Sequence, residues 1–211
     1  MVDLAEVEEE VGKTKKMIKY KEVIKILKTG GVGVVPTDTL YGLVGSALNK
    51  KTVERVYQLR KRDLKKPMII LISSLNDLKK FGIILVSSQK KILDEVWPAK
   101  VSVVFECKLK KWEHLHRGQK TLAFRFPADK VLVSLLKKVG PLVAPSANLA
   151  GKKPAETYAE ARKYFGEDVD FYVDSGKLKS KPSTLVEFGK DGQLKILREG
   201  AVKIAKTAKI G

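Results

Sequence analysis

The sequence predicts a single α/β domain built on a mixed β-sheet. Segments with helical spacing of apolar residues alternate with short apolar or β-branched runs, which is the α/β pattern. The last strand-like runs, 171–173, 184–188 and 194–197, follow one another without helices between them, which favours a mixed sheet over a purely parallel one. No linker, repeat or change of composition divides residues 17–200.

Apolar side chains recur with the helical period in five segments. The first has Val23 and Leu27 on one face and ends at the glycine pair Gly30–Gly31. The third starts at a serine that can cap it and ends before a proline. The predicted helices are 17–28, 51–62, 87–96, 130–138 and 155–165.

Short apolar runs bounded by polar turns predict the strands. Residues 101–105 are apolar at nearly every position, which indicates burial on both faces. The predicted strands are 32–35, 68–72, 101–105, 121–126, 141–144, 171–173, 184–188 and 194–197.

The chain is strongly basic, with 42 Lys and Arg against 24 Asp and Glu in 211 residues, a net charge of +18. Residues 1–12 hold five acids and no Lys or Arg, so the remainder has 42 basic and 19 acidic residues, a net charge of +23. Such an excess attracts polyanions such as nucleotides, tRNA or other RNA. For most individual lysines, the exposed surface of a heat-adapted protein is an equally good explanation.

Other features of the sequence bear on the cellular location of the protein. No apolar run approaches the ~20 residues that span a bilayer. The acidic N-terminus does not resemble a signal peptide, and Cys107 has no second cysteine to pair with, so we expect a cytoplasmic protein. We expect residues 1–16 to be a peripheral extension and residues 203–211 a C-terminal tail.

Several common catalytic motifs are missing from the sequence. There is no phosphate-binding P-loop, and Pro36 stands where a dinucleotide-binding fingerprint needs its third glycine. His114 and His116 lack further ligands with metal-site spacing, so we expect ordinary loop histidines and no metal site. The sequence therefore does not predict covalent catalysis.

Polar clusters instead follow the predicted strands and one helix, where α/β folds place ligand sites. Each alone has a structural explanation: a Thr-Asp turn satisfies its own backbone, and cations stabilise a helix C-terminus. Arg125 is more informative, because an arginine in mid-strand either pairs with a buried carboxylate or faces a ligand. The clusters are 36–43, 60–67, 121–127, 145–151, 182–184 and 198–200.

Taken in order, these clusters resemble the YrdC-like family, which includes the threonylcarbamoyl-AMP synthases. The matching pieces are GGVGVVPTDTLYGL, RKRDLKKP, TLAFRFP, PLVAPSANLAG, KPSTLV and ILREG. The resemblance implies one YrdC-like domain over residues 17–202, with a twisted mixed sheet flanked by helices and a basic concave surface. The chain resembles the short, single-domain members.

The resemblance also implies an activity. Family members combine L-threonine, bicarbonate or CO2, and ATP, accompanied by Mg2+, into L-threonylcarbamoyl-adenylate and release pyrophosphate. A transferase complex then passes the group to tRNA, and several members bind tRNA or double-stranded RNA. A YciO-like paralogue, or a double-stranded RNA- or ribosome-binding protein without this activity, remains the alternative.

The family's binding positions carry over residue by residue. Arg60 and Arg62 would stabilise charge on phosphate, with no covalent catalytic residue. The positions implied for ATP are Arg62, Lys66, Ser102, Asn148 and Arg198. The positions implied for threonine are Thr39, Arg125, Ser146 and Ser183.

Three departures from the family pattern are visible. Residues 97–100 read WPAK where family members carry G-P after W-P. Leu71 stands where longer members often have a histidine, and Ala150 and Ala155 replace small hydroxyl residues.

Overall fold

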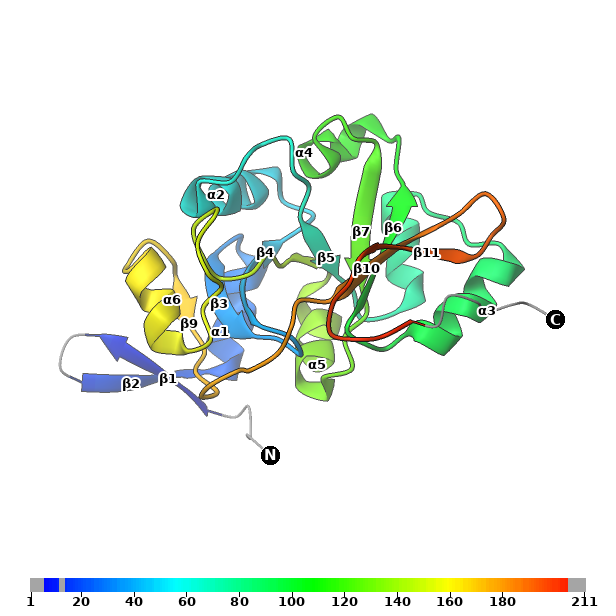
Figure 1. Cartoon of the computed structure of the whole chain (residues 1–211). Coiled ribbons are helices and arrows are strands. Elements are labelled where there is room, and N and C mark those ends of the chain that lie inside the picture. Colours follow the sequence, from blue (N-terminus) through cyan, green and yellow to red (C-terminus); the bar gives the residue numbers. More distant parts are fainter. Residues whose placement is uncertain (1–5, 12–13, 205–211) are drawn as a thin grey trace.

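The computed structural model describes residues 6–11 and 14–204, and it contains a nine-stranded sheet (Figure 1). In spatial order the strands are β11 (Leu194–Arg198), β10 (Thr184–Phe188), β6 (Val101–Glu106), β7 (Thr121–Arg125), β5 (Ile69–Leu71), β8 (Leu142–Val143), β4 (Tyr41–Ser46), β3 (Val32–Pro36) and β9 (Phe171–Tyr172). The pairs β10–β6, β5–β7 and β3–β9 are parallel, and the other pairs are antiparallel. The predicted mixed α/β fold is confirmed.

Helices cover both faces of the sheet and bury a separate apolar core on each. The helices are α1 (Tyr20–Lys28), α2 (Lys50–Arg60), α3 (Ser87–Val96), α4 (Glu113–His116), α5 (Lys130–Val139) and α6 (Tyr158–Phe165), with 3-10 turns η1 (Leu75–Phe81) and η2 (Lys110–Trp112). The helices α1 and α5 pack on one face, side by side in Figure 1. The larger core under α2, α3, α4, α6 and η1 covers the other face.

The N-terminal helix is shorter than its apolar spacing predicts. It begins at Tyr20, because Thr14–Lys19 forms strand β2, which pairs antiparallel with β1 (Glu6–Val11). This hairpin includes the described part of the extension expected over 1–16 and continues to Lys19, where a helix was expected; residues 1–5 and 12–13 lie outside the described residues. Residues 205–211 of the expected C-terminal tail also lie outside the described residues. No helix in the described ranges is long and apolar enough to cross a membrane.

Three further segments differ from the prediction in their secondary structure. Residues 41–46, of which 41–43 were expected in the polar turn 36–43 and the rest had no assignment, form strand β4 in the middle of the sheet. The helix expected from residue 155 begins at Tyr158, because the hydroxyl of Thr157 accepts a hydrogen bond from the Glu160 amide and caps it. The two histidines expected in a loop lie on the single turn of α4.

Candidate active site

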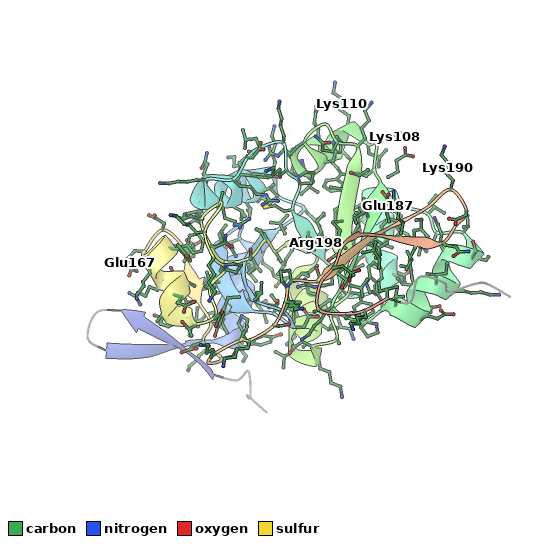
Figure 2. The ribbon with its side chains drawn as sticks, in the orientation of Figure 1. Lys108, Lys110, Glu167, Glu187, Lys190 and Arg198 are labelled. Carbon is green, nitrogen blue, oxygen red and sulfur yellow. The ribbon has the colours of Figure 1, made fainter. Side chains whose placement is uncertain are left out.

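A cavity of about 290 Å³ opens where strands β3, β7 and β8 end and β5 begins, and it contains most of the predicted site residues. Figure 2 shows Arg198 near the middle of the molecule, whereas Lys108, Lys110 and Lys190 lie at its rim. Seven predicted residues line the cavity: Thr39, Arg60, Arg62, Arg125, Ser146, Ser183 and Arg198. Segments 160 residues apart in sequence therefore meet at one place.

The turn between β3 and β4 presents two threonine hydroxyls to the cavity. Thr37 Oγ1 accepts hydrogen bonds from the amides of Thr39 and Leu40, at 3.2 and 3.3 Å. It also lies 2.7 Å from the Leu40 carbonyl and 3.0 Å from Thr39 Oγ1. This network of hydrogen bonds stabilises the turn, and the same turn lines the cavity. The cluster therefore fits both the structural and the ligand-binding explanation.

Arg125 ends β7 and is almost fully buried, yet it lines the cavity. Its Nη2 lies 3.2 Å from Asp38 Oδ1 and 3.4 Å from Thr37 Oγ1. Burial lowers the pKa of Arg125, and the negative charge of Asp38 opposes that effect. Burial likewise raises the pKa of Asp38, with Arg125 and Lys100 opposing it. Arg125 thus pairs with a buried carboxylate and faces the cavity at the same time.

Arg60, the last residue of α2, is held rigidly by the segment that follows β8. Its Nε donates to the Asn148 carbonyl at 2.9 Å and its Nη2 to Asn148 Oδ1 at 3.0 Å. Ser146 Oγ donates to the same Oδ1 at 2.6 Å. Burial lowers the pKa of Arg60 to about 10, so it stays charged at neutral pH.

The chain reverses at Lys61, whose φ of 49° lies in the left-handed region, and this places Arg62 on the cavity as well. Arg62 donates from Nε to the Lys66 carbonyl at 2.9 Å and from Nη2 to the Pro67 carbonyl at 3.0 Å. In the described part of the chain, neither Arg60 nor Arg62 forms an ion pair with a carboxylate.

Hairpin β10–β11 brings the last two lining residues to the cavity. Arg198 Nη2 donates to the Ser183 carbonyl at 2.7 Å. Gly200 makes this approach possible, because a Cβ there would lie 2.4 Å from the Thr184 amide nitrogen. Ser183 Oγ in turn lies 2.8 Å from the buried hydroxyl of Ser102.

Three of the predicted ATP-binding residues are not among those that line the cavity. Ser102 and Asn148 stand behind the wall, where they support Ser183 and Arg60. The side chain of Lys66 is 70% exposed and its Nζ lies 3.9 Å from Asp63 Oδ2. Their contact with ATP stays a prediction.

Sequence reasoning missed two neighbours of Arg125. It anticipated a buried carboxylate partner without identifying Asp38, and it treated the Thr37 hydroxyl only as a possible substrate contact, not as a neighbour of Arg125. The signal was present, since both residues precede Thr39 in the same turn, but the order of strands that brings this turn to the end of β7 appears only in the fold.

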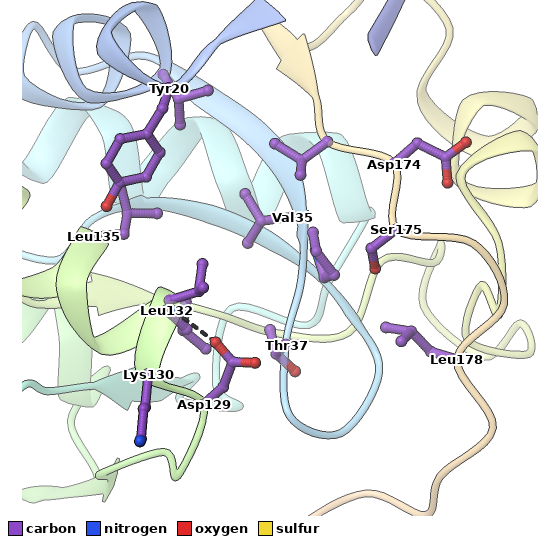
Figure 3. A pocket seen from close by; sticks show the side chains of 14 residues that line it. Tyr20, Val35, Thr37, Asp129, Lys130, Leu132, Leu135, Asp174, Ser175 and Leu178 are labelled. Carbon is purple, nitrogen blue, oxygen red and sulfur yellow. Dashed lines mark hydrogen bonds between the residues drawn. The ribbon is translucent and has the colours of Figure 1, made fainter. Parts of the chain in front are cut away.

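A second cavity, of about 400 Å³, also borders the turn after β3 (Figure 3). Its walls are largely apolar, with Val35, Leu132 and Leu135 among them. None of the predicted site residues lines it, and Thr37 is the residue that borders both cavities. Because four arginine side chains line the smaller cavity, that cavity is the candidate active site.

Comparison with known proteins agrees with the sequence motifs. The family model Sua5_yciO_yrdC, described as "Telomere recombination", matches residues 25–200. A relative from Methanocaldococcus jannaschii is 31% identical over 194 residues, which cover 90% of this chain and 91% of the relative. A threonylcarbamoyl-AMP synthase from Nitrosococcus oceani is 29% identical over 170 residues, covering 80% of this chain and 92% of the relative.

Solved structures share the fold. P. abyssi Sua5 complexed with L-threonine superposes with a TM-score of 0.78 at 24% identity over 85% of this chain. The match covers 53% of that protein, so this chain corresponds to about half of it. E. coli YciO superposes with a TM-score of 0.76 at 22% identity, covering 86% of this chain and 89% of that one. The chain belongs to the Sua5/YciO/YrdC family.

Proposed function

We propose that the chain condenses L-threonine, bicarbonate or CO2, and ATP into L-threonylcarbamoyl-adenylate and pyrophosphate. One observation carries the proposal: a single cavity is lined by four arginines together with the hydroxyls of Thr39, Ser146 and Ser183. Relatives that align over most of their length are threonylcarbamoyl-AMP synthases, which supports the same reaction.

The triphosphate would bind at the end of the cavity that holds Arg60 and Arg62. Their guanidinium groups are buried or half-buried, charged and free of carboxylate partners among the described residues. Planar guanidinium groups bind phosphate oxygens through paired hydrogen bonds. Asn148 fixes the orientation of Arg60 before ATP arrives, which lowers the entropic cost of binding.

Threonine would bind in the same cavity with its carboxylate on Arg125. Thr39, Ser146 and Ser183 offer hydroxyl groups that can accept from the amine and bond the substrate hydroxyl. A P. abyssi relative with this fold has been solved with L-threonine, which supports an amino-acid site in this family.

The chemical step needs no nucleophile from the protein. The threonine amine and CO2 give a carbamate, whose oxygen attacks the α-phosphorus of ATP while the bond to pyrophosphate breaks. The cavity contributes positioning of the two substrates and positive charge near the phosphate oxygens. We propose MgATP as the form of the nucleotide, with Mg2+ held by phosphate oxygens and water.

The threonylcarbamoyl-adenylate product would be the substrate of a later reaction that modifies tRNA. We propose that a tRNA threonylcarbamoyl-transferase complex takes up the adenylate and that the setting is the cytoplasm. The excess positive charge of the chain supports contact with tRNA or double-stranded RNA during this transfer.

Pyrophosphate release from ATP tests the proposal. We expect release that requires both L-threonine and bicarbonate, together with formation of the threonylcarbamoyl adenylate detected by mass spectrometry. Release without either requirement, or no release, would support the YciO-like alternative, which the similar fold of E. coli YciO keeps relevant. Strongly salt-dependent RNA binding without turnover would support the RNA-binding alternative.

A further inference from the structure

The four arginines of the cavity differ in the charge that surrounds them. Arg60, Arg62 and Arg198 donate to carbonyl, amide or hydroxyl oxygens, all neutral, within the described residues. Arg125 alone has a carboxylate partner, Asp38, at 3.2 Å. The side chains of this pair are 4% and 6% exposed.

Asp38 is an unusual structural partner. Within the described part of the chain, no side chain other than Arg125 bonds either of its buried oxygens; the Ala128 backbone amide faces the carboxylate without a hydrogen bond of good geometry, and Arg125 Nε also lacks one. A buried ion pair that leaves its remaining polar atoms unsatisfied contributes little net stability. Stability alone therefore does not explain a carboxylate at this position.

We propose that Asp38 determines specificity: it neutralises Arg125, so that this end of the cavity accepts an amino-acid carboxylate and rejects phosphate. The inference rests on the proposed function, because it concerns where the two substrates bind. Phosphates carry more charge than a carboxylate, so a cavity with four uncompensated arginines would attract ATP along its whole length.

Hydrogen bonding and charge act separately at Arg125. Arg125 keeps N–H donors for a carboxylate while paired with Asp38, but the pair has almost no net charge. A dianion at Arg125 would also lie within a few ångströms of the Asp38 carboxylate. At an effective dielectric constant of about 20, removing that unit charge strengthens dianion binding by more than about tenfold. Discrimination by a repulsive charge is a common route to specificity.

Sulfate is a suitable probe, because it has the shape of phosphate and remains a dianion between pH 5 and pH 8. We compare the wild-type protein with Asp38→Asn, and with Asp94→Asn, which removes the same charge from an exposed position on α3. Pyrophosphate release is measured against threonine and against ATP at several sulfate concentrations.

In wild-type protein and in Asp94→Asn, we expect sulfate to compete with ATP and not with threonine. In Asp38→Asn we expect sulfate to compete with threonine as well, with an inhibition constant at least about tenfold lower. A purely structural role would lower thermal stability and activity without changing the pattern of competition. An unchanged pattern in Asp38→Asn would overturn the proposal.

The wild-type protein provides a second measurement if Asp38→Asn does not fold. Acidification protonates Asp38, and burial raises its pKa, so its charge is lost at a higher pH than that of an ordinary aspartate. Competition between sulfate and threonine should therefore grow as the pH falls, and a flat profile would contradict the proposal. Arg125, Lys100 and Asp129 are the charged groups nearest to Asp38, and Asp129→Asn separates the contribution of that carboxylate.

The two proposals fail in different ways. If wild-type protein releases no pyrophosphate, the proposed function fails, and calorimetric titration of sulfate into wild-type and Asp38→Asn protein still tests the charge argument. If the wild type is active but Asp38→Asn binds sulfate no more tightly, only the role of Asp38 fails.

Discussion

Replacing Asn148 with alanine tests whether this residue acts through Arg60. The buried side chain accepts hydrogen bonds from Arg60 Nη2 and Ser146 Oγ, and its Nδ2 donates to the carbonyls of Leu149 and Lys152 at 2.7 and 2.8 Å. A hydrogen bond to a charged group contributes about 1.5–3 kcal/mol and a neutral one about 0.5–1.5 kcal/mol. Because water can reach part of the emptied site, we expect a loss of about 3 kcal/mol in the free energy of unfolding.

That loss corresponds to a fall in Tm of roughly 6–12 °C for a domain of this size. The freed Arg60 guanidinium no longer points at one place, so we expect the KM for ATP to rise about tenfold. Urea unfolding and pyrophosphate release measure the two effects. Asn76→Ala, an exposed position on η1, is the matched control and should change stability by less than about 0.5 kcal/mol. A variant with unchanged stability and unchanged KM for ATP would refute this account of Asn148.

Three other substitutions separate contact with substrate from support of the site. Arg62→Ala should reduce adenylate formation by orders of magnitude while circular dichroism shows an intact fold; wild-type activity would remove Arg62 from the mechanism. Lys66→Ala should change the KM for ATP by less than about threefold, because its side chain is 70% exposed and turned to Asp63; a large increase would return Lys66 to the ATP site. Gly200→Ala should destabilise the protein by about 2 kcal/mol in urea unfolding, because the new Cβ would lie 2.4 Å from the Thr184 amide nitrogen; an unchanged midpoint would show that β11 shifts freely.

The sequence predicts the class of fold well because its periodicity is regular. Helices α2, α3 and α5 lie within about two residues of the expected bounds, and so do most strands. Strand β4 escaped prediction because Gly42 and Gly45 interrupt its apolar run, and glycine indicates a turn when read alone. In the sheet, Thr52 Cγ2 would lie 2.5 Å from a Cβ at Gly45, so helix α2 packs where a side chain would otherwise stand.

The candidate site is predicted less completely. The motifs identify residue types and segments, but they do not show the direction in which each side chain points. Motifs place Ser102, Asn148 and Lys66 in the right segments, yet no pattern tells whether a side chain faces a cavity or the wall behind it. Asp38 shows the converse case, because only the order of the strands in the folded sheet brings the β3–β4 turn to Arg125. Which carboxylate neutralises which arginine is a property of the assembled sheet.

The parallel pairing of β10 with β6 has a consequence for how the protein is made. Ser183 and Arg198 lie far along the sequence from Thr39 and Arg60, and the four residues meet only after this strand has joined the sheet. During synthesis the earlier arginines are therefore exposed before their cavity can close, and contacts of such long sequence separation form slowly. A nascent chain on the ribosome would complete the candidate site only when β10 and β11 have left the exit tunnel.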